Sequence, residues 1–459
     1  MGEPRQLWQS PRMMRVPEAG GPGATSSATM VRALTAQPVA LRWLNFRERV
    51  AISMWFVPLM FAFAALVLSS VGIWIGNQLA LHSALLPGTT SGSAEQVSAT
   101  IASGMLAFTA VVFATTLVAI QLAGGQYSPR IVRAFVRSRL THCTLGVLLA
   151  TSVFAINTLG HTRDGANAHV PVVTVSALYA LVLVTLVMFV VFANGIVHLL
   201  RVQYLLRIVT ESGRETIERF IPTERADQAA SAPIPSAAPV PLRNQRHTGV
   251  LMSVDIHSLA GLAAQARSWI ELVVQPGEYL AFGTPVALVH GGDGGTPGAD
   301  AVLWHMLVGP ERTLVQDPGF ALRQLVDGAS RALSPAVNDP TTAVQVIDRI
   351  VDLLSICATR PDPSGWYVDA HGVVRVRVPE LGFARLAELG FTEIALYGAG
   401  APQVVRRLRA AYDVLEELVG SDRRATLETL CHQLTVAARD AVPPAFTEIN
   451  SRPDRLGLG

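Results

Sequence analysis

Four long apolar runs in the first half of the chain constrain its fold more than any other feature. A helix needs about 20 mainly apolar residues to cross about 30 Å of hydrocarbon. The runs that meet this requirement span residues 52–75, 101–123, 143–159 and 170–198. Only 15% of the residues are charged, against about 25% in an average soluble domain, so the composition agrees. We therefore predict a membrane α-helical domain with four transmembrane helices, followed by a cytoplasmic α+β soluble region.

Arginine residues gather in the loops at alternate ends of these spans. Arg42, Arg47 and Arg49 come directly before the first span, and four arginines separate the second span from the third, whereas Glu95 is the only charged residue of the loop over residues 76–100. Basic loops remain on the cytoplasmic side of a membrane. All 36 lysine and arginine positions hold arginine, as in proteins of GC-rich bacterial genomes. We predict a multi-pass protein of the bacterial inner (plasma) membrane with both termini cytoplasmic.

Composition and periodicity divide the chain into six segments. Residues 1–40 lack the apolar core of a signal peptide, and we expect them to form a disordered N-terminal tail. The remaining segments are a four-helix transmembrane domain with a cytoplasmic helix extension (41–222), a Pro/Ala-rich linker (223–247), a small β-rich module (248–310), an α-rich cytoplasmic domain with a short strand pair (311–445) and a flexible tail (446–459). Residues 274–285 resemble turns of lipoyl-like barrel-sandwich modules, which carry cofactors on a lysine. The chain has no lysine, so such a module would be structural, and whether it has that fold stays open.

The second span carries the polar side chains of greatest interest. Thr109 and Thr116 form one weakly polar stripe, and Gln121 lies on a face with several alanines. One interpretation is the lining of a polar pathway, in a homo-oligomer packed through its small residues. The alternative is ordinary helix packing, with each threonine bonded to its own helix. No ionisable residue lies in the middle of any span, which argues against a proton-coupled pump.

A basic segment follows the second span. Ser128 and Pro129 have the pattern of a helix start, after which Arg130, Arg133 and Arg137 fall on one face. Such a helix lies at the membrane surface and contacts anionic lipid headgroups of the bilayer. The alternative is that these arginines only set the topology.

The loop over residues 334–340 is the most specific feature of the soluble half. Asp339 has the pattern of a helix N-cap, with Pro340 in the first turn. Ser334, Asn338 and Asp339 also supply oxygen atoms for a ligand loop, and further acidic residues in the flanking helices could add ligands for Mg²⁺ or Ca²⁺. The alternative is that these oxygens serve as helix caps and in surface salt bridges. We commit to no metal ligand.

No pattern in the chain is typical of an enzyme. Without lysine there is no Schiff base and no phosphate-loop lysine. The histidines lack metal-ligand spacing, and Cys143, Cys357 and Cys431 are too scattered to form a CxxC pair. The net charge of +2 gives no reason to expect nucleic acid as a partner. We expect no catalytic, cofactor-binding or metal-binding residues and no cofactor.

Several motifs resemble one bacterial family. Residues 104–130 end in LVAIQLAGGQYSPR, and the soluble half contains DPGF at 317–320, ALSPAVNDP at 332–340 and YGAG at 397–400. Together they resemble the family of predicted membrane proteins named domain of unknown function 2254, over about residues 44–442. The resemblance implies the class of protein and brings no activity with it.

Two functions therefore stay open. The chain is a channel-like, solute-conducting oligomer with a cytoplasmic regulatory domain, or it is a membrane-anchored sensor or scaffold whose soluble half binds a ligand or partner. A pore-lining second span would favour the first function. A ligand site in the soluble half would favour the second.

Overall fold

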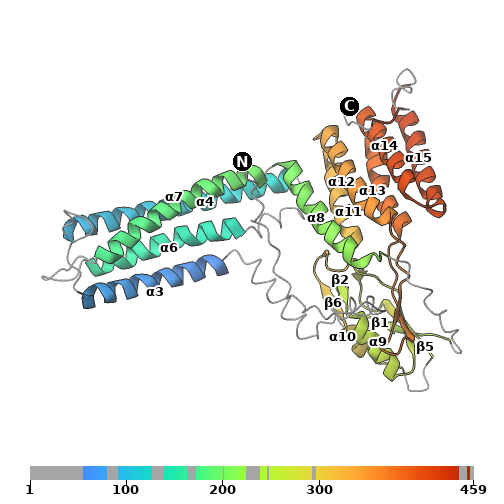
Figure 1. Ribbon diagram of the computed structural model, residues 1–459, viewed down its shortest axis with the longest axis horizontal. Coiled ribbons are helices and arrows are strands. Elements are labelled where there is room, and N and C mark those ends of the chain that lie inside the picture. Colours follow the sequence, from blue (N-terminus) through green and yellow to red (C-terminus); the bar gives the residue numbers. More distant parts are fainter. Residues whose placement is uncertain are drawn as a thin grey trace, which may run out of the picture.

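The fold begins with four long apolar helices. The computed structural model describes residues 55–79, 91–126, 139–162, 172–199, 201–223, 238–245, 248–291, 296–443 and 452–454. Each of the helices α3 (Phe56–Leu79), α4 (Ser91–Gln126), α6 (Arg139–Thr162) and α7 (Val172–Leu199) contains a stretch long and apolar enough to cross a membrane. The four predicted apolar helices are thus confirmed. They form a long bundle at one end of the molecule, and the soluble half lies at the other (Figure 1).

Helix α6 is the centre of this bundle. It packs against α3, α4 and α7. In its most apolar segment 56% of the residues are buried, compared with 22% in the corresponding segment of each of the other three helices. The polar contacts between helices also involve α6. The hydroxyls of Thr151 and Thr185 lie 2.9 Å apart, and the Asn157 amide donates to the Ser69 hydroxyl over 2.7 Å. The polar side chains singled out in the sequence lie on α4, whereas both of these contacts involve α6.

A strand module follows, built from two sheets. The five-stranded sheet has the order β1 (Val240–Arg243), β5 (Pro285–His290), β3 (Trp269–Leu272), β8 (Val374–Arg377) and β7 (Trp366–Val368). The three-stranded sheet has the order β4 (Tyr279–Leu280), β2 (Gly249–Val254) and β6 (Met306–Gly309). All neighbours are antiparallel except β3 and β8. Helices α9 (Ile256–Gln265) and α10 (Ala299–Trp304) complete the strand module.

The boundaries of the strand module differ from the expected ones. Strand β1 lies in the segment interpreted as a Pro/Ala-rich linker and pairs with β5. The β7–β8 hairpin, assigned from the sequence to the α-rich domain, pairs with β3 through parallel contacts of Ile270 with Val376. Both differences have the same physical cause. Pairing between strands that are far apart in the chain leaves no local pattern in the sequence.

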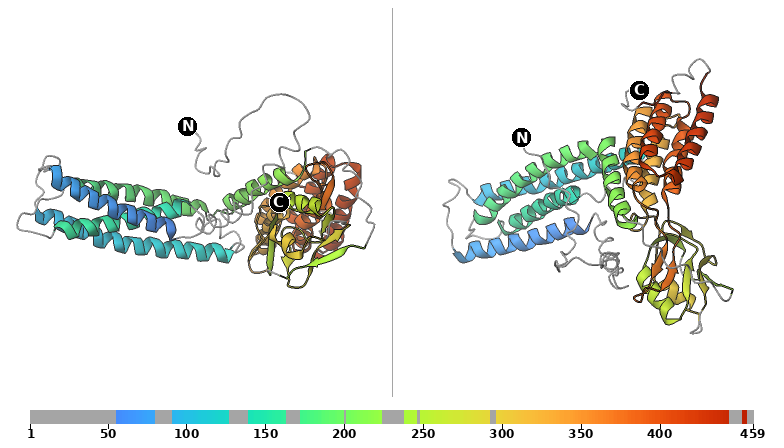
Figure 2. Two further views of the ribbon diagram at one scale, coloured as in Figure 1. Left: turned by 90° about the horizontal axis from the view of Figure 1, so that it is seen from below. Right: turned by 45° about the vertical axis from the view of Figure 1, so that its right-hand side comes forward.

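The helical module contains α8 (Val202–Phe220), α11 (Pro318–Ala332), α12 (Pro340–Ala358), α13 (Phe383–Gly398), α14 (Pro402–Leu418) and α15 (Ser421–Ala441). Helix α8 was expected as an extension of the transmembrane domain, but its Leu206, Val209 and Ile217 are buried in one core with α11 and α12. The contact is close, because a Cβ on Gly213 would lie 2.5 Å from the Cβ of Ala321. Figure 2 shows α8 between the apolar bundle and the rest of the soluble half.

Two arginines hold the ends of helices at the junction of the modules. The Arg360 guanidinium donates to the carbonyls of Glu218 and Ile221, at 3.3 and 3.0 Å, and thereby caps the end of α8. The Arg423 guanidinium donates to the carbonyls of Cys357 and Arg360 at the end of α12. A cation at a helix C-terminus satisfies free carbonyls and opposes the helix dipole. The end of α8 is therefore held where the helical and strand modules meet.

Candidate ligand site

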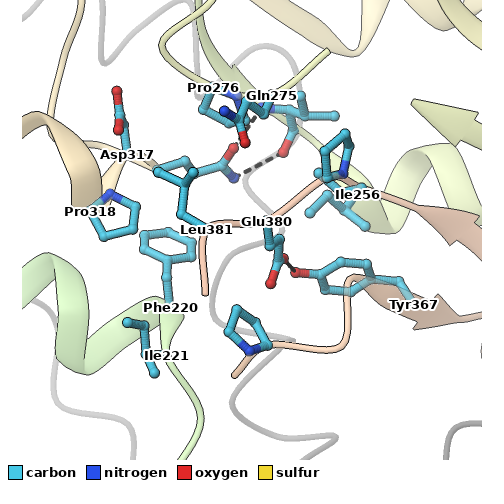
Figure 3. Close-up of a pocket in the computed structure, with 15 residues that line it drawn as sticks. Phe220, Ile221, Ile256, Gln275, Pro276, Asp317, Pro318, Tyr367, Glu380 and Leu381 are labelled. Carbon is cyan, nitrogen blue, oxygen red and sulfur yellow. Dashed lines mark hydrogen bonds between the residues drawn. The ribbon is translucent and has the colours of Figure 1, made fainter. Parts of the chain in front are cut away.

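A pocket lies at the junction of α8, the strand module and the first turn of α11. Its apolar wall includes Phe220 and Ile221 from the end of α8, Ile256 from α9, Pro318 from α11 and Leu381, which precedes α13 (Figure 3). Four of the fifteen lining residues are prolines, and their fixed backbone φ angles favour a preformed wall. Polar groups enter this wall at only a few places, which is the usual composition of a small-molecule site.

Gln316 is one of these polar groups, and its hydrogen bonds are structural. Its side-chain oxygen accepts from the backbone N–H of Val254 over 2.7 Å, and its amide donates to the Val254 carbonyl over 2.9 Å. The side chain therefore pairs with the end of β2 as a neighbouring strand would. This contact joins the segment before α11 to the three-stranded sheet.

Asp317 also lines the pocket, and its charge is balanced. Its side chain is 1% exposed, and the Arg312 guanidinium binds it through two contacts of 2.5 and 3.1 Å. Burial raises the pKa of Asp317, and the hydrogen bond and charge of Arg312 act in the opposite direction. Gly277 has φ +97° and lies directly against this pair, so a side chain there would meet both Asp317 and Arg312. The Pro276–Gly277 turn and the DPGF motif thus form one side of the pocket, and the ion pair of Arg312 with Asp317 holds this side together.

Glu380 is the unusual polar group of the pocket. Its carboxylate accepts a hydrogen bond from the Tyr367 hydroxyl, which comes from β7 (Figure 3). Burial raises the pKa of Glu380, and only the Tyr367 hydrogen bond opposes this shift. Burial and the neighbouring Glu380 charge likewise raise the pKa of Tyr367. Within the described part of the chain, no arginine or histidine lies within ion-pair distance of Glu380. The pocket therefore holds a carboxylate without a neutralising cation.

The polar residues proposed on the second span lie apart from this pocket. The hydroxyls of Thr109 and Thr116 donate to the carbonyls of Met105 and Val112, at 2.7 and 2.6 Å, within their own helix. Thr116 is buried, whereas Gln121 is exposed on the surface of α4. The threonine geometry matches the helix-packing alternative.

Arg130, Arg133 and Arg137, the proposed lipid contacts, fall outside the residues that the structure describes.

The loop over residues 334–340 uses most of its polar groups locally. The Asp339 carboxylate accepts from the backbone N–H of Thr342 over 3.1 Å, which confirms the predicted N-cap of α12. The Ser334 hydroxyl donates to the Arg331 carbonyl over 2.7 Å. Asn338 is exposed and has φ +48°, a left-handed backbone that asparagine tolerates better than most residues. The contacts of Ser334 and Asp339 are those of a capped turn.

The flanking acidic residues favour the salt-bridge alternative to a cation site. Asp327 pairs with Arg323 over 2.7 Å, and Asp348 pairs with Arg407 over 2.6 Å. Asp317 is paired with Arg312, and Asp339 caps α12. The carboxylates of these four residues therefore have separate partners. Across the described ranges, no three His, Cys, Asp or Glu side chains are grouped to hold a metal ion.

The sequence analysis identified only one side of the pocket. The DPGF motif contains Asp317 and Pro318, and the Pro276–Gly277 turn was recognised as a turn. Glu380 and Tyr367 were not singled out. Their local signal is a glutamate in a Val-Pro-Glu sequence that follows the short strand β8, and this signal is weak.

The fold defines a membrane protein with a large soluble α/β half that contains a pocket at the junction of its modules. The chain belongs to the family described as predicted membrane protein (DUF2254), whose model matches residues 51–413. It is 32% identical over 379 residues to an uncharacterized protein of Mycobacterium tuberculosis, covering 80% of this chain and 72% of the relative. An uncharacterized protein of Mycobacterium bovis matches with the same identity and coverage. No solved structure matches the chain.

Proposed function

We propose that this membrane protein is a ligand-responsive sensor. A small molecule binds in the junction pocket of the soluble half, and α8 transmits the resulting change to the membrane helices. One observation carries the proposal: the pocket is lined by Phe220 and Ile221 at the end of the helix that follows the last span. The proposal assigns binding to the pocket and no catalysis, cofactor or metal.

Helix α8 contacts the membrane bundle at its other end. Tyr204, in its first turn, packs against Ala119 of α4, as do Ile120 of α4 and Ile196 of α7. Helix α8 also contacts α7. Helix α8 has 19 residues and is therefore about 28 Å long at about 1.5 Å per residue. A ligand that binds two arrangements of α8 with different affinity shifts their populations. A change at Phe220 would thus reach α4 and α7 through one rigid element.

The proposal places the soluble half in the cytoplasm of a bacterial cell. The arginine bias of the loops supports this orientation in the inner membrane. Arg130, Arg133 and Arg137 would then lie on the cytoplasmic side, where anionic lipid headgroups attract them. These arginines are close in sequence to the end of α4, the helix whose Ala119 Tyr204 contacts.

A substitution that fills the pocket tests this proposal without knowledge of the ligand. Leu381→Trp places an indole in the pocket, and Leu396→Trp is the matched control because Leu396 is 64% exposed on α13. Hydrogen–deuterium exchange of the full chain in nanodiscs is the measurement. We expect Leu381→Trp to change exchange at Tyr204 and at the facing ends of α4 and α7. A change confined to the residues around the pocket would contradict the sensor.

A second function is a conduit between copies of the chain. It is favoured by Gln121, a polar amide exposed on α4, on the face that also carries the exposed Ala107, Ala110 and Ala114. Small residues allow close helix approach, and a glutamine can hydrogen-bond across it. A second copy would cover this face and produce a homo-oligomer.

Solute flux in proteoliposomes tests the conduit. Gln121→Leu should change the flux of ions or small solutes. Thr116→Val should not, because Thr116 bonds to its own helix. Wild-type vesicles no leakier than empty ones, under voltage and osmotic stress, would exclude the conduit.

A further inference from the structure

We infer that the junction pocket binds a small organic cation with an apolar body, such as a primary amine, and that Glu380 is the counter-ion for its ammonium group. This inference rests on the proposed function, because it names the ligand class of the same pocket. It goes further by assigning one residue the task of recognition. The case is made from charge balance, the pocket wall and the hydrogen bonding of Glu380.

Charge balance distinguishes Glu380 from three other shielded carboxylates of the soluble half, while a fourth, Asp255, is used as the cap of α9. Asp317 is paired with Arg312, and Asp369 with Arg375 over 2.9 Å. Glu271 is paired with Arg377 over 2.7 Å. Each of these carboxylates is at most 21% exposed and has an arginine partner. In the described residues Glu380 has only the neutral Tyr367 hydroxyl.

A carboxylate in an apolar pocket is costly when ionised and unpaired. It either keeps its proton or acquires a cation. Among the described residues the chain supplies no cation to Glu380, since Arg312 directs its Nε and Nη2 groups to Asp317 and does not shift the pKa of Glu380. A ligand that brings its own positive charge converts this cost into an ion pair in a site shielded from water.

The rest of the wall selects an apolar body. Phe220, Ile221, Leu381 and Pro318 line the pocket on the side of Glu380 away from Tyr367 in the close-up (Figure 3). Burying an alkyl chain against these side chains contributes about 0.8 kcal/mol per methylene by general transfer data. The aromatic rings of Phe220 and Tyr367 also attract a cation that lies over their faces. An amine with a short branched or aromatic chain meets both requirements.

Other ligand classes fit less well. An anion would face two carboxylates, Glu380 and Asp317, and the two guanidinium contacts of Arg312 already go to Asp317. A neutral apolar molecule would bury Glu380 further without compensating its charge. The cation is the one class that improves the electrostatics of the pocket when it binds.

The raised pKa of Glu380 gives this inference a pH signature. An ammonium ion binds the ionised carboxylate, so binding favours the ionised form of Glu380 against the raised pKa. The affinity for an amine should therefore increase as the pH rises through the range in which Glu380 titrates. Of the other titratable groups at the pocket, Asp317 is neutralised by Arg312, and Tyr367 keeps its proton because its pKa is raised.

Three matched probes test the ligand class on the full chain in detergent. Isopentylamine, isopentanol and isovalerate share one apolar body and carry a positive, a neutral and a negative head. Thermal unfolding with each probe at millimolar concentration is the measurement. We expect only the amine to raise the melting temperature, by about 3 °C when the site is well occupied. Glu380→Gln keeps the shape and a hydrogen-bonding partner for Tyr367, and should abolish this increase. Glu428→Gln, at an exposed position on α15, should retain it.

The outcomes separate the ligand class from the sensor itself. An equal increase with amine in wild type and Glu380→Gln would overturn the assignment of Glu380. An increase with isopentanol or isovalerate that Leu381→Trp removes would overturn the cation while leaving the pocket as the ligand site. No response to any of the probes would also overturn the cation, and the exchange measurement with Leu381→Trp would then decide the sensor independently. If Glu380→Gln melts far below wild type without ligand, the pH dependence of amine binding to wild type decides instead, and a flat dependence overturns the inference.

Discussion

The contact of α8 with the helical module gives the sharpest prediction for stability. A Cβ added at Gly213 would lie 2.5 Å from the Cβ of Ala321 and 3.1 Å from a methyl of Leu353. Carbon atoms pack at about 3.5–4.0 Å, so the helices must separate by about 1 Å. The Cβ of Ala321 cannot rotate away, and Ala321 is fully buried. Gly213→Ala should therefore lower the free energy of unfolding, and Gly213→Val should lower it further.

The expected magnitudes follow from two opposing effects. Overpacking a core costs about 1–3 kcal/mol, whereas alanine favours a helix interior over glycine by about 1 kcal/mol. We expect Gly213→Ala to lower the free energy of unfolding by about 1 kcal/mol. Gly213→Val adds two methyl groups with less gain in helix propensity, and should cost about 3 kcal/mol.

Thermal unfolding of the detergent-purified chain measures these changes. Gly328→Ala is the matched control, because Gly328 lies in α11 and a Cβ there has no neighbour within 4 Å. It should raise stability by about 1 kcal/mol through helix propensity. If Gly213→Ala proves as stabilising as Gly328→Ala, α8 does not pack closely on α11 and α12, and the proposed route through α8 fails.

The other predictions concern the cap, the pH dependence, the fragment boundary and the topology. Asp339→Ala should lower stability by about 1 kcal/mol through loss of the α12 cap, and millimolar Mg²⁺ or Ca²⁺ should raise the melting temperature of neither wild type nor variant. The raised pKa of Glu380 contributes stability that is fully present below its unfolded pKa near 4.5 and is lost as the pH rises through its folded value. The stability of Glu380→Gln relative to wild type should therefore increase as the pH rises. A difference in melting temperature between the two proteins that stays constant with pH would contradict this. A soluble fragment starting at Arg201 should melt cooperatively, whereas one starting at Arg246 should aggregate, because it lacks β1 and the α8 face of the core. Single cysteines at Gly88 and Ala166 should react with an impermeant thiol reagent in intact cells and those at Ser138 and Ala230 should not; the reverse pattern would invert the orientation.

Local patterns in the sequence account for much of the fold. The four spans follow from apolar length alone, and the start of α12 follows from Asp339 and Pro340 at adjacent positions. Helix α9 was missed, although Asp255 caps it by accepting from the backbone N–H of Ser258 over 3.1 Å. The helix is short and lies between two strands, so the change of periodicity is brief.

The pocket could not be predicted in this way. Phe220, Pro276, Asp317 and Glu380 come from four separate segments, and only the folded chain brings them together. The insertion of the β7–β8 hairpin beside β3 places Tyr367 at the pocket. That pairing joins residues about a hundred positions apart and depends on contacts that no short window contains. From the sequence, α8 was likewise assigned to the membrane domain. The pattern of an amphipathic helix does not show which core its apolar face contacts.

The central claim is that a change in the junction pocket reaches the membrane helices through α8. The most direct measurement is the quenching of a bimane label on Ile120→Cys by a tryptophan introduced as Tyr204→Trp, since both side chains pack against Ala119 where α8 meets α4. Tyr204→Leu gives the unquenched reference. The account predicts that Leu381→Trp changes the quenching and that Leu396→Trp does not, and that adding Gly213→Val removes the effect of Leu381→Trp. Equal quenching in wild type, Leu381→Trp and Leu396→Trp would contradict it.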